Sequence, residues 1–180
     1  TVGEAIYLRE LLSDVEIYVF HGVKEHECEA FFEYNLTPIL NYAEQLQMWN
    51  KFAAKKQAEL SAIIHFDSGI NRLGIEVAEW ESILLDKSSY NNLAVKYLMT
   101  HLASANQLDN PRNQEQLASF KQLAKLLPDV PLTIANSSAF FLAEEFQLDL
   151  CRPGAALFGV CPILNGKNPM QQVVSLEARI

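Results

Sequence analysis

Short apolar segments alternate with longer amphipathic segments along most of this chain. Residues 60–64 (Leu-Ser-Ala-Ile-Ile) form an apolar run typical of a buried strand, and residues 75–90 carry apolar side chains at helical spacing. The same pattern predicts strands at 16–20, 36–40, 96–100, 132–135 and 148–151, and helices at 2–12, 24–34, 41–56 and 113–127, with a further helix ending at Phe146. The sequence therefore predicts six strands, each separated from the next by a helix.

This alternation indicates a parallel sheet with right-handed crossovers, which leaves two architectures. A doubly wound nucleotide-binding sheet usually carries a glycine-rich loop after an early strand, and neither G-x-G-x-x-G nor G-x-x-x-x-G-K occurs here. Polar groups instead follow four predicted strands, at residues 65–72, at His101, at 136–137 and at 152–154. Because a (β/α)8 barrel draws its functional groups from the ends of many strands, we expect an α/β fold that is a partial TIM barrel of about six βα units.

The last segment breaks the alternation. Residues 174–180 alternate apolar and polar side chains, as a half-exposed antiparallel strand does. The chain also starts within a predicted helix that no strand precedes. We therefore expect an incomplete barrel over residues 1–164, followed over residues 165–180 by a linker and the first strand of a β-rich domain.

Composition narrows the choice of partners. The 180 residues are 49% apolar, and their net charge of −8 argues against nucleic acid or an anionic membrane as a partner. No apolar run approaches the roughly 18 residues that a membrane span needs. Cys28, Cys151 and Cys161 form no C-x-x-C pair, so we expect a reducing, cytoplasmic setting. His21, His26 and Cys28 do not have the spacing of a common metal site, and we expect no metal.

The most informative stretch joins a predicted strand to a predicted helix, and reads His65-Phe66-Asp67-Ser68-Gly69-Ile70-Asn71-Arg72-Leu73-Gly74. Polar groups at the carboxyl end of a parallel strand are where α/β proteins usually place their chemistry. The alternative interpretation is a turn with an Asx or glycine cap and a surface arginine. The turn alone leaves both interpretations open.

Five motifs, taken in order, carry a resemblance to a known family. They are Glu4-Ala5-Ile6-Tyr7-Leu8-Arg9, Asp67 to Gly74, Thr100-His101-Leu102-Ala103-Ser104-Ala105-Asn106, Ala135-Asn136-Ser137-Ser138, and Arg152-Pro153-Gly154 through Leu157-Phe158-Gly159. With them the sequence resembles the middle of bacterial alanine racemase, a pyridoxal-phosphate enzyme of fold type III with an N-terminal (β/α)8 barrel and a C-terminal β domain. The resemblance runs the whole length, implies that the strands are numbers 3 to 8 of the barrel, and matches residues 173–180 to the strand leading into the C-terminal domain.

The resemblance implies interconversion of L-alanine and D-alanine with pyridoxal 5′-phosphate as cofactor, in a homodimer that serves peptidoglycan synthesis or D-alanine breakdown. The family's cofactor lysine and opposing tyrosine have no counterpart here, because no lysine follows a strand in the expected place. We therefore expect no catalytic residue in this chain, and a fragment that is inactive alone. A barrel-only pyridoxal-phosphate-binding homeostasis protein and a non-catalytic fragment remain as alternatives. Residues 173–180 argue against the first alternative, and the missing lysine supports the second.

The resemblance also assigns residue roles. It implies cofactor binding by Arg72, His101, Asn136, Ser137, Arg152, Gly154 and Ala155, with Arg72 also holding the substrate carboxylate. The Ser137 hydroxyl and two backbone N–H groups suit a phosphate. Arg152 can donate a hydrogen bond but cannot give up its proton, so it would keep the pyridine nitrogen unprotonated, weaken the electron sink and suppress transamination. His101 would pack on the cofactor ring and bond to Arg152, although a histidine in such a position, taken alone, is more often structural.

One departure from the family pattern concerns His65. Many relatives carry there a lysine that becomes carbamylated and holds the arginine corresponding to Arg72. A histidine cannot form that carbamate, so we expect a neutral His65 and an anion or carboxylate beside Arg72. Ser68, Ile70 and Phe158 are milder departures.

Overall fold

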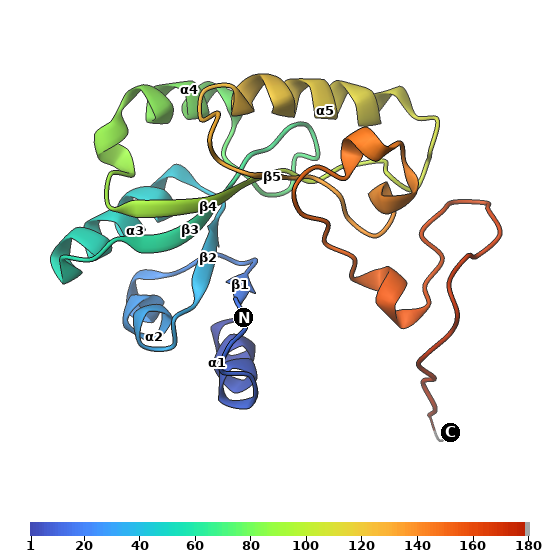
Figure 1. Cartoon of the computed structure of the whole chain (residues 1–180), viewed down its shortest axis with the longest axis horizontal. Coiled ribbons are helices and arrows are strands. Elements are labelled where there is room, and N and C mark those ends of the chain that lie inside the picture. Colours follow the sequence, from blue (N-terminus) through green and yellow to red (C-terminus); the bar gives the residue numbers. More distant parts are fainter. Residues whose placement is uncertain (179–180) are drawn as a thin grey trace.

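A five-stranded parallel sheet organises the chain (Figure 1). The computed structural model describes residues 1–178, with the side chain of residue 84 left aside. The strands lie in chain order, and they are β1 (Tyr18–Val19), β2 (Thr37–Leu40), β3 (Leu60–His65), β4 (Leu93–Met99) and β5 (Leu132–Thr133). Sequential parallel strands joined by helices are what consecutive βα units produce, so the predicted α/β class with a parallel sheet is confirmed.

Within residues 1–178, one α-helix precedes β1 and four connect the strands. They are α1 (Val2–Leu11) before β1, then α2 (Cys28–Glu33), α3 (Ala43–Lys56), α4 (Val77–Leu85) and α5 (Pro111–Ala124). Their ends follow local rules. The side chains of Thr1 and Glu4 form a capping box at α1, and Asn110 caps α5, which has Pro111 in its first turn. Short 3-10 helices complete the list, and they are η1 (Glu25–Glu27), η2 (Lys87–Ser89), η3 (Ala139–Phe141), η4 (Glu144–Phe146) and η5 (Ala155–Phe158).

The sheet separates two layers of apolar side chains. Because successive residues of a strand point to opposite faces, Leu40 and Ile64 join the large core formed with the helices, which contains Trp49 and Phe120. The opposite face carries a smaller cluster made of Ile39, Ile63 and Met99, with Tyr18 and Tyr97 packed against it. This second cluster marks the face that corresponds to the interior of a barrel, where side chains from adjacent strands stack in layers. Figure 1 shows α4 and α5 on one side of the sheet, and the segment after β5, coloured orange to red, reaching away from it.

Arg9 fastens α1 to the following loop and to the end of α2. Its guanidinium donates to five backbone carbonyls, those of Leu12, Ser13, Val15, Tyr34 and Asn35, at 2.8 to 3.1 Å. This arginine of the first family-like motif therefore has a structural role.

Three predicted elements differ in the structure. The strand expected at 148–151 does not form, because Leu148 has a positive φ of 47° that interrupts an extended chain. What remains beside β5 is an isolated bridge between Asn136 and Arg152. The helix expected to end at Phe146 is two separate 3-10 turns, η3 and η4.

The strand expected at 173–180 does not form over residues 173–178, and residues 179–180 lie outside the described residues. Val173, Val174 and Leu176 are exposed, and no strand pairs with them within residues 1–178. A strand needs a neighbour to satisfy its backbone groups, which explains the difference.

Within residues 1–178, no helix has both the length and the apolar character that crossing a membrane requires.

Candidate functional site

The polar side chains predicted from the sequence gather at the carboxyl edge of the sheet. Register explains the closest pair. β2 and β3 align Ile39 with Ile63 on the inner face, so two residues further on Asn41 and His65 lie on that same face as neighbours. His65 Nδ1 and Asn41 Oδ1 are 2.7 Å apart.

The loop after β3 is closed by its own residues. Oδ1 of Asp67 accepts the N–H groups of Gly69, Ile70 and Asn71 at 2.8, 2.9 and 3.1 Å. Gly74 has a φ of +120°, and a Cβ added there would lie 2.5 Å from the backbone nitrogen of Asp67. The predicted Asx-capped turn is therefore present, with Arg72 exposed on it.

Neighbouring elements fix this loop in place. Ser68 Oγ lies 2.7 Å from Thr100 Oγ1, just past β4, and accepts a hydrogen bond of 3.0 Å from Gln116 of α5. Gln116 is buried and also binds the backbone of His101 and Ala103. These contacts hold the loop in one position relative to β4 and α5, so the backbone of Arg72, which the loop carries, is held there as well.

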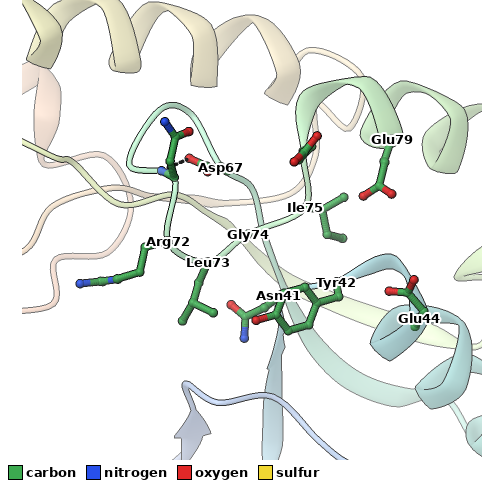
Figure 2. A pocket seen from close by; sticks show the side chains of 11 residues that line it. Asn41, Tyr42, Glu44, Asp67, Arg72, Leu73, Gly74, Ile75 and Glu79 are labelled. Carbon is green, nitrogen blue, oxygen red and sulfur yellow. Dashed lines mark hydrogen bonds between the residues drawn. The ribbon is translucent and has the colours of Figure 1, made fainter.

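A pocket of about 560 Å³ lies between this loop and the start of α3 (Figure 2). Asn41, Tyr42 and Glu44 line one side, and Arg72 and Leu73 lie on the loop across from them. Within residues 1–178, the Arg72 guanidinium makes no hydrogen bond or ion pair, so the carboxylate expected beside it is not found there.

His65 is buried and neutral. Burial and the charge of Arg152 lower the pKa of His65 to about 3. Asn41 also fixes which nitrogen carries the proton, because its Nδ2 donates to the carbonyls of Phe20 and Ile39 at 2.9 Å, leaving Oδ1 as an acceptor toward Nδ1.

His101 has a similar arrangement with Asn136. Oδ1 of Asn136 accepts the N–H groups of Ser138 and Ala139, so its Nδ2 faces His101 Nε2 at 3.4 Å. Burial, with the charges of Arg152 and Arg72, lowers the pKa of His101 to about 4. Both histidines are therefore neutral near pH 7.

Arg152 is held by three acceptors at the strand ends. Nη1 donates to Thr133 Oγ1, and Nη2 donates to the carbonyls of Thr100 and Ile134 at 2.9 and 3.3 Å. Burial lowers the pKa of Arg152 to about 10, which leaves it charged at neutral pH. The hydrogen bonds leave Nε–H without an acceptor among the described residues. They also give Arg152 a different partner from the His101 ring that the resemblance implied.

Ser137 and the loop after Arg152 form a small cradle of donors. Ser137 Oγ accepts the N–H groups of Gly154 and Ala156 at 2.9 and 3.2 Å. Ala155, the first residue of η5, donates its N–H to no described group. A Cβ added at Gly154 would meet nothing within 4 Å, so the space beside the cradle is open.

The structure brings together six of the predicted residues and leaves one apart. The contacts above, or adjacency in the chain, link His101, Asn136, Ser137, Arg152, Gly154 and Ala155, whereas Arg72 has no partner among residues 1–178. Sequence reasoning missed Asn41, Thr100, Thr133 and Gln116. Asn41 directly follows a predicted strand and Thr100 ends one, which is a signal for an edge residue. Thr133 lies inside the predicted strand 132–135, and nothing in the sequence singles out Gln116 on its helix.

Two cations offer contacts for anions at this edge, although the carboxylates of Glu44, Asp67, Glu76 and Glu79 line the pocket that includes Arg72. The histidines are neutral, Arg72 and Arg152 are cations, and neither forms an ion pair in the described part of the chain. The lysines lie elsewhere on exposed positions, except the half-buried Lys56 of α3, which pairs with Glu29 at 2.6 Å.

Comparison with known proteins agrees with this geometry. A family model described as the N-terminal domain of alanine racemase matches residues 1–162. The alanine racemase of Rickettsia akari is 42% identical over 100% of this chain and 49% of its own length. That of Rickettsia africae is 43% identical over 98% of this chain and 48% of its own length. The alanine racemase of Bartonella henselae, solved with covalently bound pyridoxal phosphate, matches with a TM-score of 0.88 at 32% identity over 94% of this chain and 49% of that one. The biosynthetic alanine racemase of Pseudomonas aeruginosa matches with a TM-score of 0.82 at 26% identity, and the match covers 93% of this chain and 46% of that one.

The parallel sheet with polar groups at its carboxyl edge therefore defines part of an α/β barrel, as predicted. The chain belongs to the alanine racemase N-terminal domain family. It spans about half the length of the curated relatives it matches.

Proposed function

We propose that this protein works as an alanine racemase, in which the carboxyl edge of the sheet holds pyridoxal 5′-phosphate and the carboxylate of alanine. The observation that carries the proposal is Arg152, a cation held by Thr133, Thr100 and Ile134 without any carboxylate partner in the described residues. Its Nε–H is left to serve a ligand acceptor. Membership of the alanine racemase family supports the choice of reaction.

The residues present fit this cofactor. The donor cradle of Ser137, Gly154 and Ala155 suits a phosphate, because backbone N–H groups at a turn attract anions and the space beside Gly154 is open. When bound, pyridoxal phosphate supplies an electron sink for the charge left when an amino acid loses its α proton. Arg152 donates and does not give up its own proton, so it keeps a ring nitrogen unprotonated. By leaving that nitrogen unprotonated, Arg152 would favour return of the proton to the same carbon, which racemisation requires.

The other assigned residues orient this arrangement. His101, neutral and bonded to Asn136, offers an uncharged ring surface, and repels the two arginines less than an imidazolium would. Arg72, on a loop that Asp67 and Gly74 close, presents a planar donor fork suited to a carboxylate or phenolate oxygen.

The direct test is cofactor binding by the 180-residue chain itself. Pyridoxal phosphate should bind with a saturable change in absorbance, and Arg152→Ala should weaken binding about tenfold. Arg112→Ala is the matched control, because Arg112 is exposed and donates only to the carbonyl of Gly69. Absence of saturable binding by the unaltered chain would contradict the proposal.

The same samples test the absence of a cofactor lysine. Since no lysine stands within the first two residues after a described strand, borohydride should trap no stoichiometric adduct, and the chain alone should not racemise alanine. A trapped adduct with measurable racemisation would show that a lysine of this chain reaches the site.

We further propose a cytoplasmic homodimer that supplies D-alanine for the cell wall. Cys28, Cys151 and Cys161 are free thiols, which suits a reducing compartment. Exposed apolar side chains, including Leu11 and Leu157, offer surface for association. Sedimentation velocity tests the dimer, and a monomer at all concentrations would contradict it.

A further inference from the structure

One buried side chain of α5 contacts two segments that carry predicted site residues. Gln116 is 3% exposed, and its carboxamide nitrogen donates to Ser68 Oγ at 3.0 Å and to the carbonyl of His101 at 3.1 Å. Its carboxamide oxygen accepts the N–H of Ala103 at 2.9 Å. Both N–H donors and the oxygen of this side chain are therefore used. A single group thus joins the loop after β3 to the segment after β4.

The direction of the hydrogen bonds beyond Gln116 is fixed by what each group can do. The carbonyl of Phe66 can only accept, so the hydroxyl of Thr100 donates to it at 2.9 Å. Thr100 Oγ1 then has no proton left for Ser68 Oγ at 2.7 Å, and the Ser68 hydroxyl must donate to Thr100. Ser68 Oγ in turn accepts from Gln116. The bonds therefore run in one direction, from the carboxamide through two hydroxyls to a backbone carbonyl, and each polarises the next.

Thr100 connects these bonds to Arg152. Thr100 is fully buried, and its backbone carbonyl accepts from Arg152 Nη2 at 2.9 Å. Its N–H donates to the carbonyl of Thr133 at 3.1 Å. The network that begins at Gln116 therefore reaches the loop after β3, the segment of His101 and the guanidinium of Arg152.

A second residue of α5 provides a comparison. Arg112 lies four positions before Gln116, on the same face of the helix, and its Nη2 donates to the carbonyl of Gly69 at 3.1 Å. Within residues 1–178, the exposed Arg112 guanidinium makes no other hydrogen bond or ion pair. Both residues contact the loop after β3, and only Gln116 joins that loop to the segment of His101.

We infer that Gln116 is a positioning residue, whose carboxamide sets the loop after β3 and the segment of His101 in a fixed relation to each other. Gln116 acts through Ser68 and the backbone of residues 101–103, without touching the ligand. The inference rests on the proposed function for its consequence, because that function assigns both segments to pyridoxal phosphate. The hydrogen bonds themselves are a property of the chain alone.

The first arm of the test uses the full chain without a ligand. Gln116→Met keeps an unbranched side chain of similar size and removes all three bonds, whereas Gln116→Glu keeps an oxygen for the N–H of Ala103 and loses both donors. Hydrogen exchange of the Ala103 N–H should therefore accelerate about tenfold in Gln116→Met and stay within about twofold in Gln116→Glu.

Amide NMR signals of the same variants report whether the two segments move together. Both Gln116 variants should shift the signals of residues 67–71 and of residues 101–103, and neither should shift that of Gly154. Arg112→Met is the matched control, and should shift the loop signals alone because Arg112 contacts only Gly69.

The second arm uses two probes, pyridoxal phosphate and inorganic phosphate, the latter measured by its displacement of the former. No bond of Gln116 reaches the donor cradle of Ser137, Gly154 and Ala155 within residues 1–178. Both Gln116 variants should therefore weaken pyridoxal phosphate about tenfold and change the affinity for inorganic phosphate by less than about twofold. Arg112→Met should leave both within about twofold. A side chain that only stabilised the fold would affect the two probes alike.

Ser68→Ala breaks the network at its second bond by removing one hydroxyl. It should weaken pyridoxal phosphate about threefold and leave inorganic phosphate unchanged, and it supplies the same comparison if Gln116→Met does not fold. Because both changes act on one network, adding Ser68→Ala to Gln116→Met should weaken the cofactor by less than about twofold further.

Each arm can overturn the inference separately from the proposed function. Equal affinity of Gln116→Met and the unaltered chain for pyridoxal phosphate would contradict it, as would an equal loss for the two probes. Loop signals that shift without those of residues 101–103 would also remove the coupling. A chain that shows the expected exchange and NMR behaviour but binds no pyridoxal phosphate would retain the coupling by Gln116 and overturn the proposed function instead.

Discussion

Two loops at the carboxyl edge are built in opposite ways. The loop of residues 67–74 folds on itself, with three N–H groups on one oxygen of Asp67 and Gly74 pressed against the chain behind it. The loop of residues 152–159 depends on a hydroxyl from another segment, Ser137, and its Gly154 stands in open space. The first loop is specified by its own sequence, whereas the second needs the neighbouring strand end to be in place.

This difference suits different tasks. A self-closed loop can present exposed side chains, here Asn71 and Arg72, from a fixed base. A loop gathered around a distant hydroxyl keeps backbone donors together while leaving room in front of them. The comparison can be tested at three levels of expected effect.

Acidification is expected to give the largest effect. His65 lies at the base of the first loop and His101 faces the segment of Asn136, and the folded chain lowers their pKa values to about 3 and about 4 from an ordinary 6.5. Between pH 6.5 and 4 the unfolded chain therefore takes up protons that the folded chain does not. The free energy of unfolding should then fall, as the pH falls, by up to about 1.4 kcal/mol per pH unit for each histidine.

Urea unfolding at several pH values measures this slope. His65→Gln should remove more of it than His101→Gln, and both are compared with Arg112→Gln, a change at an exposed position of α5. A slope that all three variants share would place the acid sensitivity elsewhere.

Paired glycine substitutions should separate the two loops next. Gly74→Ala forces a Cβ to within 2.5 Å of Asp67 N at a φ of +120°, and should lower the free energy of unfolding by about 2–4 kcal/mol. Gly154→Ala meets no atom within 4 Å and should change it by less than about 0.5 kcal/mol. Thermal or urea unfolding of both variants decides the matter, and similar losses would mean that the second loop is packed as tightly as the first.

Removing the capping oxygens should give the smallest effects. Asp67→Ala leaves three N–H groups without their acceptor and should lower the free energy of unfolding by about 2 kcal/mol. Ser137→Ala leaves two N–H groups without theirs and should lower it by about 1 kcal/mol. Asp67→Asn keeps an acceptor oxygen and serves as the control. If Ser137→Ala proved the more damaging change, the second loop would be the better anchored one.

Much of the fold follows from local pattern. The strand at 60–64 and the turn after it were predicted because apolar residues, a capping aspartate and two glycines lie next to each other in sequence. The prediction of a strand at 148–151 was wrong because Leu148 adopts a positive φ, which an apolar residue in the sequence does not predict. The segment after residue 172 shows the other limit, since an alternating pattern forms a strand only beside a partner.

The site was predictable in its location but not in its bonds. Polar residues after successive strands pointed to the carboxyl edge. The individual contacts depend on the register between strands that are separated in sequence. Examples are the hydrogen bonds of Arg152 to Thr133 and Thr100, and the contact of Asn41 with His65. Asn41 in particular was interpreted only as the start of a helix.

The Ser137 hydroxyl has a kinetic consequence. It already gathers the N–H groups of Gly154 and Ala156 around one oxygen, so these donors are aimed in advance. An arriving anion then exchanges one acceptor for another, and little chain entropy is lost in the step. Capture at this edge should therefore proceed at a rate set by diffusion and by attraction to the two arginines, with no slow loop closure in between.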